Sequence, residues 1–570
     1  MQPNLGDQTL TQSESRITPV DALAERFWEA VLELEPTTAT FYGDERYADR
    51  LEDPGPAGRA FSRDLMERTA AEAAAIESAG LTTEERITRD MLAVVAALNI
   101  EQDDQHLHQL RVVDQMGGPQ QLLPRLTQFQ PADTPERLEA FIARLHAYPG
   151  FMAANVQILQ DGMASGLTAP RVVAQRTIAQ MERMLEVPIE SAIVPSMIKV
   201  ATERDRERVR ELVRDVVHPA DVAFLEALRG DYLAASREDP GLWSAPDGEA
   251  LYRTAIRSWT TLDLDPDAVH RTGLEELESI EDERRVIAHA AGFGDDTVAY
   301  RAALDADVAN TPTTRDELIG RAGDDIERAM ALAPRWFGVL PRAAIEVRAV
   351  EEYKEKDAPP AYYYPPTPDG SRPGIYYANG YDLPSRKYSK LASTTYHEAA
   401  PGHHFQITLE MENPRLNTFR RLGARMVGGA YVEGWGLYSE RLADEMGLYR
   451  DEAERFGMLD AQAWRAARLV VDTGLHALRW PRQRSIDFLR GVGLSETDAV
   501  IETDRYICWP GQALTYKIGQ RAIEQLRTEL AARDGSAFDL RAFHDALLGH
   551  GSLPLATLQR ELPTWLAAPV

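Results

Sequence analysis

The sequence predicts a large, mainly α-helical protein with one small β element. Apolar residues recur at i, i+3, i+4 and i+7 along most of the chain, for example in DALAERFWEAVLEL and PRVVAQRTIAQMERML. Near residue 343 the pattern changes to the alternating, β-branched AAIEVRAVEEY, followed by a segment rich in Tyr, Pro and Gly. Helical periodicity resumes at LASTTYHEAA and continues to the end of the chain.

Pro and Gly clusters separate the predicted helices without marking a clear linker. We therefore expect one large helical domain over residues 16–570, made of an N-terminal lobe at 16–340 and a second part at 341–570. Residues 1–15 are polar, and we expect a flexible N-terminus there. GIYYANGY predicts a second short strand, and the two strands are expected to pair antiparallel across a long Pro-rich connection.

Composition excludes several functional classes. The net charge of −28 argues against binding to nucleic acid or to an anionic membrane surface, because both would repel such a chain. No run of about 18 apolar residues occurs, so no membrane span is expected. Cys508 is the single cysteine, which excludes an internal disulfide framework. With no evident signal peptide, a cytoplasmic location is expected, as a monomer or a homodimer.

The segment TYHEAAPGHHFQ, residues 395–406, carries the first chemical signal. His397 and Glu398 begin it as in the H-E-x-x-H helix of zinc hydrolases, but Pro401 stands where the second histidine should be. On an ideal helix His397 and His403 would lie about 120° apart around the axis, and His404 about 10.5 Å along it. Neither pair would bind one metal on an undistorted helix.

Pro401 and Gly402 suggest how that spacing changes. Proline lacks the N–H that a helix needs, and glycine accepts almost any backbone geometry. A local bulge or a broken turn at this point would bring His403, or alternatively His404, back toward His397. Glu398 would then be the general base that activates water.

A catalytic zinc ion takes three protein ligands and keeps one open position. Downstream, YVEGWGLYSERL places Glu433 between apolar and small residues, and Glu433 is the predicted third ligand. Gly434 and Gly436 would allow another helix to approach closely. Glu440 lies one heptad later, and we expect it to support a ligand or to pair with Arg441 or another neighbour.

Four segments, HEAAPGHHFQ, YVEGWGLYSERL, RLVVDTGLH and WPGQALTYKIG, resemble the signature segments of the bacterial DUF885 family. That family resembles the helical zinc peptidases, among them the M32 carboxypeptidases and the M2 peptidases. The resemblance runs from about residue 362 to residue 519. It implies a zincin-like, mainly α fold in which a deep cleft contains the metal helix, with a strand along the cleft.

The same resemblance implies roles for individual residues. Gly402-His403 is similar to the Gly-His that closes H-E-x-G-H in those peptidases, which makes His403 the second ligand rather than His404. Glu433 corresponds to their third ligand and Glu398 to their base. Tyr516 resembles the tyrosine that stabilises the tetrahedral intermediate, with Tyr506 as the alternative.

Three further polar residues are candidates for substrate binding: Gln512, Lys517 and His476. Lys517 stands out because lysine is scarce in this chain, and it would bind a substrate carboxylate. His476 follows Asp472 by four residues, a spacing that suits either a hydrogen-bonded pair near the site or a structural pair within the helix.

Together these observations predict a metallohydrolase with one zinc ion that cleaves peptide or other amide bonds in short substrates. Two alternatives remain open. The same pocket would suit a non-peptide amide or ester, and a chain that lost its metal through the Pro-Gly insertion would be a helical binding protein.

Overall fold

The computed structural model describes residues 17–187, 202–350, 355, 359–368, 370 and 372–566. It is mainly helical, as the sequence predicts, while the expected flexible N-terminus at 1–15 lies outside the described residues. In the first half the helices are α1 (Pro19–Leu34), α2 (Pro36–Phe41), α3 (Pro56–Ala75), α4 (Thr83–Asp104), α5 (Leu107–Arg111), α6 (Leu122–Phe129), α7 (Pro135–Ser165), α8 (Arg171–Glu186), α10 (Glu203–Leu212), α11 (His218–Ala227), α12 (Leu233–Ala235) and α13 (Gly248–Thr260).

The second half contains the sheet and the helices that surround it. Its strands are β1 (Ile345–Ala349), β2 (Ala361–Tyr364) and β3 (Gly374–Ala378). Its helices are α14 (Pro266–Ala290), α15 (Thr297–Ala306), α16 (Arg315–Leu332), α17 (Tyr388–Glu398), α18 (His403–Glu412), α19 (Gly429–Glu445), α20 (Glu452–His476), α21 (Arg482–Val492), α22 (Glu496–Cys508), α23 (Thr515–Asp534), α24 (Leu540–Gly549) and α25 (Leu555–Trp565).

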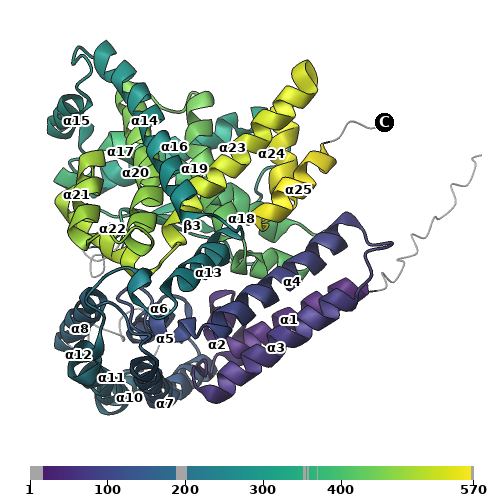
Figure 1. The fold of residues 1–570 in the computed structure, drawn as a ribbon, viewed down its shortest axis with the longest axis vertical. Helices are drawn as coiled ribbons and strands as arrows, with labels where there is room; N and C mark the ends of the chain where they lie inside the picture. Colours follow the sequence, from purple (N-terminus) through teal and green to yellow (C-terminus); the bar gives the residue numbers. More distant parts are fainter. Residues whose placement is uncertain are drawn as a thin grey trace, which may run out of the picture.

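Two large apolar clusters join the halves of the chain. One combines α1, α3 and α4 with α19, α23, α24 and α25, and the other combines α7, α8 and α11 with α20, α21 and α22 (Figure 1). Helix α20 contributes to both clusters and is buried along most of its length, from Phe456 to His476. It packs against α14 on one side and α17 on another, so it is the central helix behind the candidate site.

The sheet differs from the prediction. It has three strands in the order β1-β3-β2, and β1 and β3 run parallel rather than antiparallel. The strand that the prediction missed, β2, lies inside the Pro-rich connection and pairs antiparallel with β3. β2 occupies the edge of β3 that a simple hairpin would use. β1 therefore pairs with the other edge of β3 and runs in the same direction as β3.

No helix among the described residues is long and apolar enough to cross a membrane.

Arg144 on α7 connects three segments of the N-terminal half. Its guanidinium is fully buried, and burial lowers the pKa of Arg144 to about 10 because its hydrogen-bond partners are neutral. The acceptors are Pro36 O, Thr40 Oγ1, Tyr47 O, Arg50 O and Gln130 Oε1, at 2.6 to 3.1 Å.

Replacing Arg144 with Met should lower the free energy of unfolding by about 3 kcal/mol or more, because several buried acceptors lose their donor at once. Arg137→Met on the same helix removes only partly exposed ion pairs with Glu45 and Asp133, and should cost about 1 kcal/mol or less. Thermal denaturation of both variants checks the difference, and equal losses would contradict the assigned role of Arg144.

Candidate metal centre

The helix that begins with Tyr388 does not continue through the motif. Helix α17 ends at Glu398, residues 399–402 leave the helical conformation, and α18 begins at His403. Of the two distortions that Pro401 and Gly402 predict, the structure has the broken turn. Gly402 is required there, because a Cβ atom would lie 1.8 Å from the carbonyl oxygen of His397.

Trp435 of α19 fixes this broken turn. Its side chain is fully buried, and its indole N–H is shared between the carbonyl oxygens of Pro401, at 3.0 Å, and Gly402, at 3.1 Å. The Gly402 carbonyl also accepts the backbone N–H of Gln406 in α18, at 3.2 Å. The tryptophan adds a further donor at this point and holds the broken turn against α19.

The break brings His397 and His403 face to edge. Their ring centroids are 4.8 Å apart and the ring planes are inclined by 85°. Both Nε2 atoms face the same carboxylate oxygen of Glu433, at 3.6 Å from His397 and 3.8 Å from His403. The three predicted ligands thus converge from the end of α17, the start of α18 and the N-terminal part of α19.

His404 points away from this cluster. Its Nδ1 atom lies 2.8 Å from the hydroxyl of Tyr363 and 3.3 Å from that of Thr408. Burial lowers the pKa of His404 to about 4, so the ring is neutral and holds the sheet against α18. Of the two histidines that the spacing left open, the geometry brings His403 to His397.

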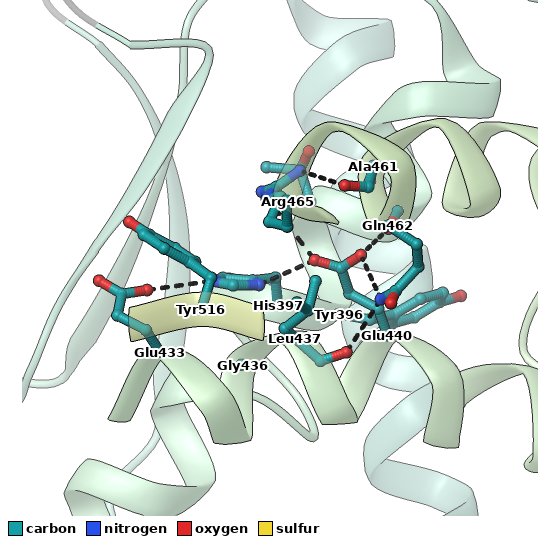
Figure 2. A network of polar contacts seen from close by, with 12 residues as sticks. Tyr396, His397, Glu433, Gly436, Leu437, Glu440, Ala461, Gln462, Arg465 and Tyr516 are labelled. Atoms are coloured by element: carbon teal, nitrogen blue, oxygen red, sulfur yellow. Dashed lines mark hydrogen bonds and ion pairs between the residues drawn. The ribbon is translucent and has the colours of Figure 1, made fainter. Parts of the chain in front are cut away.

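Glu440 supports His397 from behind. One of its carboxylate oxygens lies 2.8 Å from His397 Nδ1, and the other accepts a hydrogen bond from Ser393 Oγ at 2.8 Å. Gln462 donates to the same carboxylate at 3.3 Å. Figure 2 shows the imidazole of His397 between Glu433 on one side and Glu440 on the other. Arg441, the other partner considered for Glu440, pairs with Glu283 instead.

Gly436 makes room for the histidines. A Cβ atom at this position would lie 2.7 Å from His397 Nε2 and 3.0 Å from His403 Cε1. Gly434 serves the helix contact that the sequence predicts, because a Cβ there would lie 2.5 Å from the Cα of Gly519 on α23. The two glycines therefore have different roles on one helix, one toward the site and one toward α23.

The electrostatics of the cluster are set by three carboxylates around two imidazoles. Burial lowers the pKa of His397, but the carboxylates of Glu433 and Glu440 outweigh this effect and raise it to about 10. For Glu433, burial raises the pKa and the two histidines outweigh it, so the value falls to about 2. Burial and the charge of Glu433 raise the pKa of half-buried Glu398 to about 7, although His397 opposes them.

Glu398 lies beside the histidines, as the motif predicts. One atom each of His397, Glu398 and His403 can be chosen so that all lie within 4.8 Å of one another. Glu398 is the last residue of α17 and keeps part of its side chain accessible. A carboxylate in this place can accept a proton from a water molecule held at the cluster.

Tyr516 reaches the cluster from α23. Its ring stacks on His397 at 6.2 Å between centroids, with an interplanar angle of 26°. Arg505 donates to the Tyr516 hydroxyl at 3.3 Å and to Gln512 Oε1 at 2.9 Å, so the predicted Gln512 lies beside Tyr516. The guanidinium of Arg468 lies over the Tyr516 ring, 4.2 Å from the ring centroid.

Three predicted residues have other partners. The Tyr506 hydroxyl is buried and accepts hydrogen bonds from Trp464 and Arg468. Lys517 is buried behind the site and donates to Gln462, the residue that contacts Glu440. Both ring nitrogens of His476 are occupied by backbone groups, the N–H of Leu242 and the carbonyl of Tyr506.

Asp472 does not form the expected pair with His476. It accepts hydrogen bonds from the hydroxyl of Tyr252 at 2.6 Å and from the N–H of Gly511 at 3.1 Å. The two residues are therefore structural, and they fix the turn before α23. The sequence reasoning missed Arg468 and Arg505, although an arginine inside the apolar RLVVDTGLH segment is a signal that could have found the first.

The residues fit a zinc ion. Two imidazoles and one carboxylate are a donor set of catalytic zinc sites, and a carboxylate behind the first histidine is their usual support. His397 has this support from Glu440, whereas His403 Nδ1 is buried and has no hydrogen-bond partner within the described residues. His397, His403 and Glu433 would hold the ion.

A family model described as a bacterial protein of unknown function, DUF885, matches residues 36–562. The chain belongs to the DUF885 family. No curated protein matches it.

Two solved structures are similar in fold to this chain over nearly its whole length. A crystal structure of a candidate lipoprotein from Colwellia psychrerythraea is 28% identical, with a TM-score of 0.87 over 96% of this chain and 98% of that chain. A candidate lipoprotein of unknown function from Shewanella oneidensis is 18% identical, with a TM-score of 0.71 over 95% of this chain and 99% of that chain. The second likeness concerns the fold alone.

Replacing His403 with Ala should weaken zinc binding by more than the 10- to 100-fold that loss of a supporting residue costs, because a direct ligand is lost. His404→Ala is the matched control. It should keep zinc affinity and lower the melting temperature, because Tyr363 loses its partner. Calorimetric zinc titration and thermal denaturation of both variants check this, and the reverse pattern would make His404 the ligand.

Glu440→Gln should weaken zinc binding about 10- to 100-fold, because the amide holds the His397 ring less firmly than the carboxylate does. Glu445→Gln, on the same helix but paired with Arg527 at the surface, should bind zinc like the wild type. Zinc titration of the two variants is the measurement, and an unchanged affinity for Glu440→Gln would remove Glu440 from the account.

Proposed function

We propose that this chain is a zinc-dependent hydrolase of peptide or other amide bonds in small substrates, related to the M32 and M2 type of helical metallopeptidase. The observation that carries the proposal is the convergence of His397, His403 and Glu433 from three helices next to Glu398. A structural zinc site would not need an acid of this kind beside its ligands, whereas hydrolysis needs a base there.

A bound zinc ion would lower the pKa of a water molecule toward neutrality and polarise the substrate carbonyl. Glu398 accepts a proton from the attacking water and delivers it to the leaving amine. Its raised pKa suits this double role, because a base that titrates near neutrality can both take and return the proton. Glu440 keeps the ring of His397 in one orientation throughout.

In this proposal Tyr516 donates to the developing oxyanion. Arg505 already donates to the Tyr516 oxygen, so the phenolic hydrogen is left for another acceptor. Arg468, stacked over the ring, holds positive charge close to the same position. A preorganised donor with a positive environment stabilises a tetrahedral intermediate without moving during the reaction.

The proposed site would suit more than one class of substrate. A cleft of the kind that the resemblance to helical zinc peptidases implies would favour short peptides over folded proteins, and a non-peptide amide or an ester would need the same groups. A metal-free binding protein is the competing function, and an absence of zinc binding would favour it. Release of amino acids from a library of short peptides separates peptide cleavage from the other hydrolyses.

We also propose that the chain acts as a cytoplasmic monomer or homodimer, without nucleic-acid or membrane partners. The Colwellia relative is described as a candidate lipoprotein, which offers a cell-envelope location as the competing possibility. Fractionation of cells that produce the full-length protein distinguishes the two locations.

Glu398→Gln should lower hydrolysis of the best substrate by at least about 100-fold, because general base catalysis contributes 10²- to 10⁴-fold. Zinc affinity should remain, since Glu398 is not among the three proposed ligands. Turnover with peptide, anilide and ester substrates, together with zinc titration, checks both parts. Turnover that survives in Glu398→Gln would show that another group is the base.

A further inference from the structure

A cavity of about 430 Å³ lies in the N-terminal half of the chain, between α3, α4, α5, α6 and α7. Its volume is within the range of small-molecule sites. None of the residues of the candidate metal centre lines it. The cavity is therefore a separate feature of the molecule, with its own charge and its own walls.

Three arginines on its wall, Arg59, Arg111 and Arg125, form what we call the arginine cluster. Each donates only to neutral oxygens: Arg59 to Pro54 O at 2.8 Å, Arg111 to Gln102 Oε1 at 2.6 Å, and Arg125 to Gln121 O and Gly117 O, both at 3.4 Å. A guanidinium has five N–H donors, so these one or two contacts leave most donors of each arginine available.

The carboxylate that lines the cavity is already paired with an arginine. Asp103 also lines the wall, and it pairs with Arg63, a fourth arginine of the wall, at 3.1 Å. The arginine cluster thus adds positive charge that no carboxylate of the cavity wall balances. This local excess is notable in a chain whose net charge is −28.

Arg111 faces the open space of the cavity. Burial lowers the pKa of Arg111, and no acidic neighbour offsets the effect. The residue is nevertheless exposed, as Arg125 is, while Arg59 is half-buried, so a ligand can reach the arginine cluster from solvent. A guanidinium that pairs with no carboxylate of the cavity wall can bind an oxyanion through charge-assisted hydrogen bonds.

The remaining wall is largely apolar. Met66, Leu107, Phe151 and Ile158 contribute from α3, α5 and α7. A bare inorganic ion would leave this surface in contact with water, whereas an organic anion would cover it.

We propose that this cavity binds a small organic anion, with a carboxylate or phosphate group on the arginine cluster and an apolar body against Met66 and Phe151. Guanidinium forks match both oxyanions in a bidentate manner, so the two headgroups share one recognition chemistry. The proposal does not depend on the metal centre and would survive its failure.

Calorimetric titration of the protein with octanoate, octyl phosphate and 1-octanol tests the proposal. At least one of the two anions should bind with a stoichiometry near one, and the better anion identifies the headgroup. The neutral alcohol should bind at least tenfold more weakly, because it lacks the anionic headgroup. Inorganic phosphate should also bind at least tenfold more weakly, because it lacks the apolar body. An alcohol or a bare phosphate that binds as tightly as the anions would overturn the proposal.

Variants locate the binding. Arg111→Gln and Arg125→Gln should each weaken binding of the better anion tenfold or more. Arg68→Gln is the control, because Arg68 is exposed, as Arg111 and Arg125 are, but pairs with Asp64 and does not line the cavity. Failure of both anions to bind the wild type, or equal affinity in the wild type and both cavity variants, would overturn the proposal.

Discussion

The candidate site depends on one constraint, the interruption of a helix between Glu398 and His403. The chain can break there because Pro401 has no N–H to lose and Gly402 fits against the His397 carbonyl, where a side chain would collide. Trp435 then donates its indole N–H to the carbonyl oxygens of Pro401 and Gly402 and holds the broken turn in place. Without this arrangement the two histidines would project from different sides of one helix and would not share a ligand.

The same constraint organises the neighbouring helices. Trp435, which fixes the turn, belongs to α19. It lies two positions after Glu433 and one position before Gly436, and Gly436 lies against both histidines. Close contact of α19 with α23 at Gly434 and Gly519 then brings Tyr516 onto the His397 ring. Backbone contact, rather than long side chains, therefore sets the distances within the site. The central helix α20 adds Gln462 and Arg468 from behind.

The sequence predicts the helical fold and the residues that converge, because both correspond to local patterns in the sequence. Periodicity identifies an amphipathic helix, and an acid among Gly and Trp marks Glu433 as unusual. The direction of β1 leaves no such signal, since it depends on β2 taking one edge of β3 first. The positions of Lys517 and His476 depend on partners far along the chain, Gln462 in one case and Leu242 in the other. The spacing alone could not choose between His403 and His404, because it does not state where α18 begins.

The central claim is that His397, His403 and Glu433 hold one zinc ion. Anomalous diffraction at the zinc edge, from crystals of the wild-type protein grown with zinc, tests it most directly. The account predicts one strong peak within bonding distance of both Nε2 atoms and of a Glu433 carboxylate oxygen, and beside Glu398. A peak on His404 instead, or no peak at the cluster, would contradict it.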